Sequence, residues 1–358
     1  MKQFYKIAVL LLIPFVSFAN HDKFKGKYTK EKTIKKEFSV NEEASLEVDN
    51  SYGNITIVSW NENRIIIEVF IKTNGNSEEK VQERLDEIQI ELSGNSSKVT
   101  AKTNINANES SSWWRNSNSN VSMEINYVIK VPETNTIDLN NRYGAITVGN
   151  HKGTAKINNK YGQLSVGNLM ADDNYIQIKY VKTATIVSMK SGKIVAGYST
   201  FTLNNSEKLE LVADYTTSNL GVIGDLNYRN RYGKLNADNA GDVLGEASYN
   251  NVKFEKISGN ANFNLRYSGL TVGLLTATAK DVTIQGSYSG ITLGIENGYA
   301  FDFEADLKYG SLKGTDFMNI TSKDKSGSKS NYEGYHKNQN SENKISINSS
   351  YGSVTLNN

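Results

Sequence analysis

One short phrase dominates the hydrophobic pattern of the chain and recurs twelve times: Tyr, usually a small residue, any residue, apolar, any residue, apolar. It first reads Tyr52-Gly53-Asn54-Ile55-Thr56-Ile57 and last reads Tyr351-Gly352-Ser353-Val354-Thr355-Leu356. From Tyr143 to Tyr288 the successive steps are 18, 19, 18, 17, 17, 17, 18 and 21 residues. A period of about 20 residues is typical of stacked repeat architectures.

Each copy of the phrase predicts a half-buried strand that follows a bend. The third and fifth residues after the Tyr are apolar in ten of the twelve copies each, and the residue between them is mostly Thr or Ser. Gly follows the Tyr in six copies, and because Gly tolerates positive φ we expect the bend there. The residues to which we assign this structural repeat are Tyr52, Tyr143, Tyr161, Tyr180, Tyr198, Tyr215, Tyr232, Tyr249, Tyr267, Tyr288, Tyr309 and Tyr351, with Gly53, Gly144, Gly162, Gly233, Gly310 and Gly352.

The predicted fold class follows from the shortness of these strands. A strand of about five residues cannot bury a face alone, whereas stacked coils pair each strand with its equivalent one period away and form continuous apolar columns. We therefore predict an all-β, parallel β-solenoid of the β-helix or β-roll kind, with coils of about 17–21 residues. One short N-terminal helix is expected after Asn76-Ser77, with Val81, Leu85 and Ile88 on one face.

The chain divides into three predicted parts. Residues 1–19 have the basic start, short apolar run and Ser17-Phe18-Ala19 ending of a secretory signal peptide. Residues 20–132 are expected to form an N-terminal β region that caps the solenoid, with a projecting Asn/Ser-rich loop at 104–120. Residues 133–358 are expected to form the repeat solenoid, with a mobile low-complexity insertion at 321–344.

Composition narrows the classes of function. Without Lys2 and Lys6 of the leader, the 40 basic residues fall to 38 and match the 38 acidic ones, so nothing favours a nucleic-acid partner. The chain has no Cys and three scattered His, and we predict neither a metal site nor a cofactor. No segment after the leader is apolar enough to predict a transmembrane helix.

The N-terminal part resembles the DUF4097 family of bacterial adhesin-like proteins. The resemblance rests on Ser45–Asn50, the Gly-x-Ile-x-Ile phrase, the turn Val58–Asn63, Leu85–Glu91 and the strand ending in Val131-Pro132. It covers roughly residues 38–314 and implies a secreted β-solenoid without a diagnostic active site. The chain departs from the family pattern in the Tyr before the Gly, in the Trp-Trp loop and in the 321–344 segment.

Three features are candidates for recognition. Trp113 and Trp114, with Arg115, lie in a polar loop where they can contact a sugar or a partner protein, or can fold back over the first coil. The Tyr column can serve as an aromatic strip, but we favour a structural role in which Tyr stacks at the bend. A basic residue before the Tyr in six copies can form a rail for an acidic polysaccharide, but we favour a solvated face.

We expect an exported, non-enzymatic, adhesin-like binding or structural protein of the cell envelope, in the periplasm or on the surface of a Gram-negative bacterium. Its solenoid would present a rigid face to a glycan or an envelope protein. One alternative is a polysaccharide-active β-helix enzyme, although Asp214, Asp225, Asp238, Asp242 and Glu255 fall at different phases of the repeat. Another alternative is an outer-membrane β-barrel, although its spans need about 9–11 residues per strand.

Overall fold

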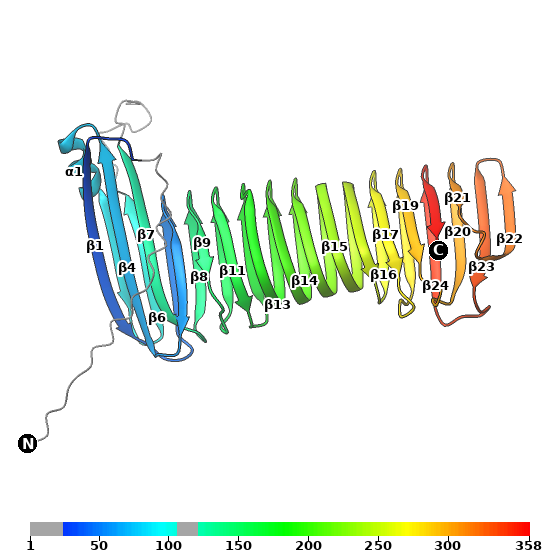
Figure 1. Cartoon of the computed structure of the whole chain (residues 1–358), viewed down its shortest axis with the longest axis horizontal. Coiled ribbons are helices and arrows are strands. Elements are labelled where there is room, and N and C mark those ends of the chain that lie inside the picture. Colours follow the sequence, from blue (N-terminus) through cyan, green and yellow to red (C-terminus); the bar gives the residue numbers. More distant parts are fainter. Residues whose placement is uncertain (1–23, 106–120) are drawn as a thin grey trace, which may run out of the picture.

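The computed structural model describes residues 24–105 and 121–358, and in them it is nearly all β with one helix. The molecule is elongated, with one open sheet wound into a stack of layers along the long axis (Figure 1). Each layer of the tyrosine repeat contains one strand before the Tyr and one after it. These two series form two walls, which we call wall A (after the Tyr) and wall B (before the Tyr).

Wall A pairs its strands in an order that differs from the chain order at both ends. The series is β1 (Tyr28–Ser39), β4 (Arg64–Gly75), β7 (Ser122–Pro132), β3 (Ile55–Trp60), β9 (Ile146–Val148), β11 (Gln163–Leu169), the first parts of β13 (Thr183–Gly197) and β14 (Thr200–Asp214), three passes of β15 (Thr217–Ile257), β17 (Gly269–Leu275), β19 (Gly290–Ile295), β25 (Ser353–Asn357) and β21 (Ser311–Lys313).

Wall B runs alongside wall A. Its series is β5 (Ile88–Gly94), β6 (Lys98–Ile105), β2 (Ser45–Ser51), β8 (Thr136–Arg142), β10 (Ala155–Lys160), β12 (Asn174–Lys179), the second parts of β13 and β14, two passes of β15, β16 (Ala261–Arg266), β18 (Val282–Ser287), β24 (Lys344–Ser350), β20 (Phe301–Lys308), β23 (Lys329–His336) and β22 (Asn319–Ser326).

The middle of the stack is parallel throughout, as the repeat predicts. Equivalent residues of successive layers pair directly, for example Ile146 with Leu164 and Leu164 with Ala184. Antiparallel pairing is confined to the two ends, at β1–β4–β7, β5–β6 and β20–β23–β22. The predicted parallel stacking of the tyrosine phrases is therefore confirmed.

The core lies between the two walls and consists of the alternate, inward residues of each strand. Ile146, Ile157, Phe201 and Phe263 are among those fully removed from solvent. Each such side chain contributes roughly 1.5–3 kcal/mol of gross burial free energy. The Tyr180 copy, whose third and fifth residues are not apolar, has one extra residue at Lys182, which shifts its inward positions to Ala184 and Ile186.

Helix α1 (Glu78–Asp86) is the helix predicted from the sequence. Ser77 is its N-cap and accepts a hydrogen bond from the Lys80 backbone, while Val81 and Leu85 are buried. The acidic residues of the first turn and the basic residue of the last turn both suit the helix dipole. The helix packs against β4 and β1 and so closes the wide N-terminal end of the molecule (Figure 1).

The prediction for the segment 321–344 was wrong. Instead of a mobile insertion, most of it forms the hairpin β22–β23, which pairs antiparallel with β20 and covers that edge of the stack. Gly327 adopts positive φ at the turn, and Ser330 and His336 are buried. A composition of Ser, Lys and Asn suggested disorder, but backbone pairing with β20 supplies the stabilisation that the side chains do not.

The order of layers departs from the order of the chain at the C-terminal end. Strands β24 and β25 lie between the β18/β19 layer and the β20/β21 layer. The last residues of the chain are thus an internal layer, and Figure 1 shows the C-terminus inside the stack and not at its tip.

Candidate functional site

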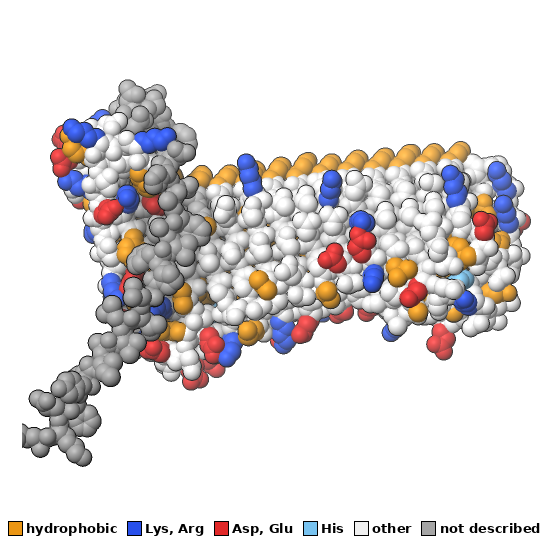
Figure 2. All heavy atoms as spheres, viewed as in Figure 1, with side chains coloured by type: hydrophobic (Ala, Val, Ile, Leu, Met, Phe, Trp, Pro, Cys, Tyr) orange, Lys and Arg blue, Asp and Glu red, His pale blue; other side chains and the backbone are white. Residues whose placement is uncertain are grey.

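The twelve tyrosines form one uninterrupted stack of rings along an edge of the molecule, which we call the tyrosine ridge. Neighbouring ring centroids lie 4.7–5.2 Å apart, and neighbouring ring planes are inclined by 3–19°. All except the half-buried Tyr52 are 40–57% exposed. Figure 2 shows a continuous row of hydrophobic side chains along the edge of the stack.

The sequence analysis expected positive φ at the Gly after each tyrosine, but the structure places it at the tyrosine itself. Each ridge tyrosine has φ between +50° and +66°, whereas the Gly after it does not adopt positive φ. Positive φ is unfavourable for a residue with a bulky side chain, at a cost on the order of 1 kcal/mol or more. The stacking of each internal ring on both of its neighbours offsets this cost, and Tyr309 at the end of the ridge stacks on Tyr351 alone.

Glycine follows the tyrosine because two backbones approach closely there, and not because of its φ. A Cβ on Gly162 would lie 1.8 Å from the backbone oxygen of Gly144, which no side chain permits. Other layers place a hydroxyl at this position instead. Ser199, for example, accepts a hydrogen bond from the Val181 backbone at 3.1 Å and donates one to the carbonyl of Gly197 at 2.8 Å.

Asn141 and Asn159, each buried two residues before a ridge tyrosine, stabilise the bends by hydrogen bonds to the backbone. Asn141 donates to the carbonyl oxygens of Gly53 and Ala145, and Asn159 donates to that of Gln163. The bond to Gly53 links two layers, whereas the bonds to Ala145 and Gln163 close the bend within one layer.

The stacking limits what the tyrosine ridge can recognise. A sugar usually packs on the face of an aromatic ring, but here the faces of the internal rings are covered by neighbouring rings. A ligand along the ridge would meet only ring edges and hydroxyl groups. The structural role of the Tyr column stays a prediction, which this geometry favours over an aromatic binding strip.

The basic residues before the tyrosines do not form a continuous rail. Arg142, Lys160 and Lys179 occupy three consecutive layers, but Gly197 and Asp214 follow. Arg231 is paired with Asp214 through two hydrogen bonds of 2.8 and 2.9 Å. The basic series is therefore interrupted after Lys179 and neutralised at Arg231, and a solvated face stays the prediction.

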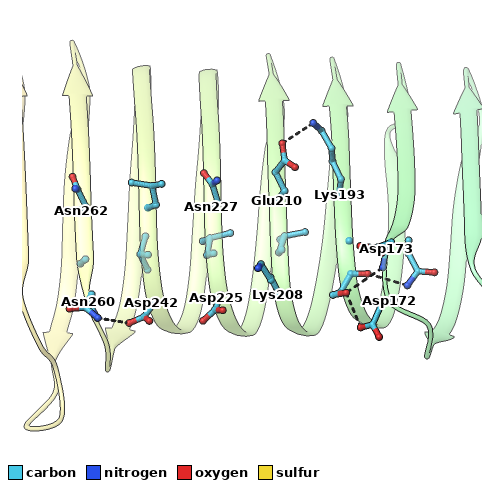
Figure 3. Close-up of a pocket in the computed structure, with 18 of the residues that line it drawn as sticks. Asp172, Asp173, Lys193, Lys208, Glu210, Asp225, Asn227, Asp242, Asn260 and Asn262 are labelled. Atoms are coloured by element: carbon cyan, nitrogen blue, oxygen red, sulfur yellow. Dashed lines mark hydrogen bonds and ion pairs between the residues drawn. The ribbon is translucent and has the colours of Figure 1, made fainter.

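Wall B carries a groove that the sequence did not predict, which we call the polar groove. Its volume is about 1040 Å³, and it crosses seven passes of the wall, in β12, β13, β14, twice in β15, in β16 and in β18. Figure 3 shows its side chains in rows that run across the strands. Adjacent strands of a sheet lie about 4.8 Å apart, so the groove extends on the order of 30 Å along the stack.

Two rows of outward side chains line the polar groove. One row lies near the turns, and the other lies two residues further along each strand. The first consists of Asp173, Ser191, Lys208, Asp225, Asp242, Asn260 and Asp281, and the second of Tyr175, Lys193, Glu210, Asn227, Leu244, Asn262 and Thr283. Amide, hydroxyl and carboxylate groups are therefore repeated at the spacing of the layers.

Ion pairs neutralise part of the charge around the groove. Lys193 pairs with Glu210 at 2.7 Å, and Lys190 pairs with Asp172 at 2.9 Å (Figure 3 shows the first). The hydrogen bond from Lys190, with a smaller one from Ser191, lowers the pKa of Asp172. The remaining lining charges are four aspartates against Lys208, so the groove has an acidic excess.

The structure corrects one inference about the acidic residues. Asp225 and Asp242 were placed at different phases of the repeat, but they lie at equivalent positions of two successive passes of β15 (Figure 3). Their separation of 17 residues equals the step from Tyr215 to Tyr232, so both aspartates lie ten residues after a ridge tyrosine. Asp242 accepts hydrogen bonds from the backbone and the amide of Asn260, at 2.7 and 3.1 Å.

Trp113, Trp114 and Arg115, like residues 1–23, lie outside the described residues. Within residues 24–105 and 121–358, no three His, Asp or Glu side chains gather as a metal site. In the same ranges, no helix combines the length and apolar character that a membrane crossing requires.

The two described histidines are buried structural residues. His151 lies between Ser59 and Asn135, at 2.8 and 2.7 Å from its two ring nitrogens. Burial lowers the pKa of His151, against a smaller opposing effect of the Asn135 hydrogen bond. His336 contacts the carbonyl oxygen of Tyr299 at 2.6 Å and packs against Phe301 and Phe317.

Comparison with known proteins gives structural likenesses only. No protein-family model matches the chain, and no curated protein matches it. A candidate cell adhesion protein from Clostridium sporogenes is 12% identical over 92% of this chain and 99% of that chain, with a TM-score of 0.19. Candidate adhesins from Bacteroides fragilis and Parabacteroides distasonis are 11% and 9% identical, each over 91% of this chain and 97% of that chain, with TM-scores of 0.22 and 0.27. Such low TM-scores carry no argument about function, and membership of the DUF4097 family stays a prediction.

Proposed function

We propose that this chain is an exported, non-enzymatic binding and structural protein of the bacterial envelope, in the periplasm or on the cell surface. In this proposal the stack of layers is a parallel β-solenoid that presents a rigid face to a glycan. The observation that carries the proposal is the polar groove across seven passes of wall B.

The groove suits a glycan because only side chains are available in it. The backbone groups of its strands already pair with the layers on both sides, so a peptide cannot bind there by adding a strand. Asn227 and Asn262 offer amides that both donate and accept, as sugar hydroxyls do. Leu244, 51% exposed, offers an apolar surface for the CH groups of a sugar ring.

The charge of the groove narrows the class of glycan. Four aspartates against Lys208 disfavour a polymer that carries carboxylate or sulfate groups, since like charges would be brought together. We therefore expect a linear neutral glycan, or one that carries free amino groups. Export is supported by the predicted signal peptide at residues 1–19.

The test is binding of the mature protein, residues 20–358, to an array of neutral, amino and acidic glycans. The double variant Asn227→Ala/Asn262→Ala should weaken binding of the best glycan about tenfold or more, because hydrogen bonds are left unmade. The control Asn264→Ala/Asn348→Ala changes two exposed asparagines of wall B that do not line the groove and should bind as the parent does. Equal binding by all three proteins would refute the groove as the site.

A Trp113→Ala/Trp114→Ala variant separates the groove from the loop. If this variant alone lost binding, the loop and not the groove would be the recognition site. Absence of binding to any glycan, together with capture of a defined envelope protein, would favour the protein partner instead.

Adjacent Asp225 and Asp242 favour one second candidate, a polysaccharide-active enzyme, because paired carboxylates are the usual catalytic groups of glycoside hydrolysis. Incubation with each bound glycan followed by mass spectrometry checks for cleavage. Cleavage by the parent that is lost in Asp225→Asn would replace the binding proposal with the enzymatic one.

A further inference from the structure

The C-terminal layer, β24 with β25, occupies a slot between two layers that precede it in the chain. Its inward residues Ile345, Ile347, Val354 and Leu356 are buried in the shared core. The ring of Tyr351 completes the tyrosine ridge, with its centroid 4.7 Å from that of Tyr288 and 4.8 Å from that of Tyr309. The slot is therefore filled as completely as any other position in the stack.

The contacts that hold this layer are the same as those between ordinary layers. The Tyr288 backbone donates to the carbonyl of Ser350 at 2.8 Å, and the Tyr351 backbone donates to that of Lys308 at 2.8 Å. Between consecutive layers the equivalent bond, from Tyr267 to Ser287, is 2.9 Å. None of these contacts depends on the covalent connection between the layer and its slot.

The connection is short and exposed. Residues 337–343 cross the start of β20, from His336 on one side of that strand to Lys344 on the other. Its contacts with the body include hydrogen bonds from Ser341 and Asn343 to the carbonyl oxygen of Ala300, at 2.9 and 3.3 Å. Seven residues span at most about 25 Å, which is enough to reach an adjacent molecule.

The ends of the sheet are less suited to association between copies. The edge strands β1 and β22 are exposed and rich in lysine, which discourages edge-to-edge pairing. The edge strand β21 is only three residues long, and the Leu92 carbonyl of the remaining edge strand, β5, already accepts a hydrogen bond from the Lys36 side chain at 2.8 Å. The slot for the C-terminal layer is thus the place where a second copy can make a full set of native contacts.

We propose that the C-terminal layer is exchangeable and that its partner is a second copy of this chain, which inserts its own residues 344–357 into the slot. Every contact within the closed monomer has an identical counterpart in the exchanged dimer, so the difference in free energy comes mainly from the connection and from concentration. The effective concentration of a tethered segment is on the order of millimolar, so exchange should be populated by refolding at high protein concentration.

The absence of cysteine from the sequence allows a direct test. Thr292 and Thr355 are half-buried partners in the parallel pairing of β19 with β25. Full-length Thr292→Cys and Thr355→Cys chains are unfolded together, refolded at high concentration and treated with a short bis-maleimide. A covalent heterodimer is expected only when the β25 strand of one chain lies in the slot of the other.

A matched pair controls for nonspecific contact. Thr271 and Thr292 are equivalent partners in β17 and β19, which are both internal in the chain. A mixture of Thr271→Cys and Thr292→Cys chains should give at least about fivefold less heterodimer than the mixture of Thr292→Cys and Thr355→Cys chains. The reason is that an internal layer cannot be exchanged alone. The Thr292→Cys/Thr355→Cys double variant should crosslink within one chain, and its crosslinking yield is the reference for the yields of the two mixtures.

Equal heterodimer yields from the two mixtures would overturn the proposal. So would a yield near zero in both mixtures while the double variant crosslinks internally, because the layer would then remain in its own chain. Neither result depends on whether the protein binds a glycan.

Discussion

The N-terminal region, residues 28–132, and the tyrosine stack that follows it are built from the same kind of strand but end differently. In the stack each strand continues the parallel pairing of the layer before, and the edge is always open to one more layer. In the N-terminal region β4 and β1 turn antiparallel on wall A, and β5 does so on wall B. The outermost strand of wall A, β1, is antiparallel and rich in lysine and glutamate. Such an edge discourages the addition of a further strand, so the stack ends there.

The comparison shows where each region obtains its stability. A layer of the stack contacts only its two neighbours, so its stability is a sum of nearly identical local interfaces. The N-terminal region adds a helix, longer strands and buried hydrogen bonds between segments far apart in the chain, such as that from the Asn50 amide to the carbonyl oxygen of Ile125 at 3.0 Å. Three changes test this distinction, from the largest expected effect to the smallest.

The largest effect is expected from Gly162→Ala in the stack. The new Cβ would lie 1.8 Å from the backbone oxygen of Gly144, and backbone cannot move aside without separating two layers. The free energy of unfolding should fall by about 3 kcal/mol or more. Chemical denaturation followed by circular dichroism measures the change.

Gly290→Ala is the matched control, because nothing lies within 4 Å of the Cβ that it would add. It should change the free energy of unfolding by no more than about 1 kcal/mol. If both variants lost the same stability, close backbone approach would not be the reason for glycine after tyrosine.

An intermediate effect is expected from Tyr232→Ser in the tyrosine ridge. The variant loses ring contacts with Tyr215 at 4.8 Å and Tyr249 at 5.1 Å. At about 0.5–1.5 kcal/mol for each contact, the free energy of unfolding should fall by roughly 1–3 kcal/mol.

Tyr309→Ser sharpens this prediction, because Tyr309 ends the ridge and stacks only on Tyr351. Its loss should be about half that of Tyr232→Ser. Equal melting temperatures for Tyr232→Ser and the parent, together with weakened ligand binding, would instead make the ridge a recognition surface.

Most of the stack could be predicted from the sequence because its information is local. The alternation within Tyr52–Ile57 and its copies specifies which residues face inward, and inward faces can be buried only by stacking. The N-cap at Ser77 likewise needs only its own neighbours to be recognised. The positive φ of the tyrosines could not be predicted, since it follows from ring stacking between layers.

The order of the layers could not be predicted for a different reason. The apolar columns of all layers are equivalent, so Val354 pairs as well with Ile291 as with Leu312, and pattern alone does not exclude insertion of the last layer. The polar groove was missed because its residues are ordinary outward positions in each strand. Only the common register brings Asp225, Asn227 and Leu244 to one surface.

The smallest effect is expected at the junction of the two regions, where His151 is buried between Ser59 of β3 and Asn135. The Asn135 carbonyl can only accept, so Nε2 carries the proton and Nδ1 accepts from the Ser59 hydroxyl. Burial lowers the pKa of the imidazole in the folded state, although the charge of nearby Glu133, itself paired with Lys152, opposes the shift.

The sign of the pH dependence follows from proton binding. Below an unfolded pKa of about 6.5 the unfolded chain binds a proton at this site that the folded chain does not, so stability is lost as pH falls through this range. The free energy of unfolding is measured from pH 7.5 to 5.5 for the parent and for His151→Gln, which cannot titrate. The carboxylates and His336 are common to both proteins, so the difference between the two curves isolates the effect of His151. The parent's free energy of unfolding minus that of His151→Gln should be smaller at pH 5.5 than at pH 7.5. A constant difference would mean that the junction accepts a charged imidazole, and that the N-terminal region is attached to the stack less tightly than the buried histidine implies.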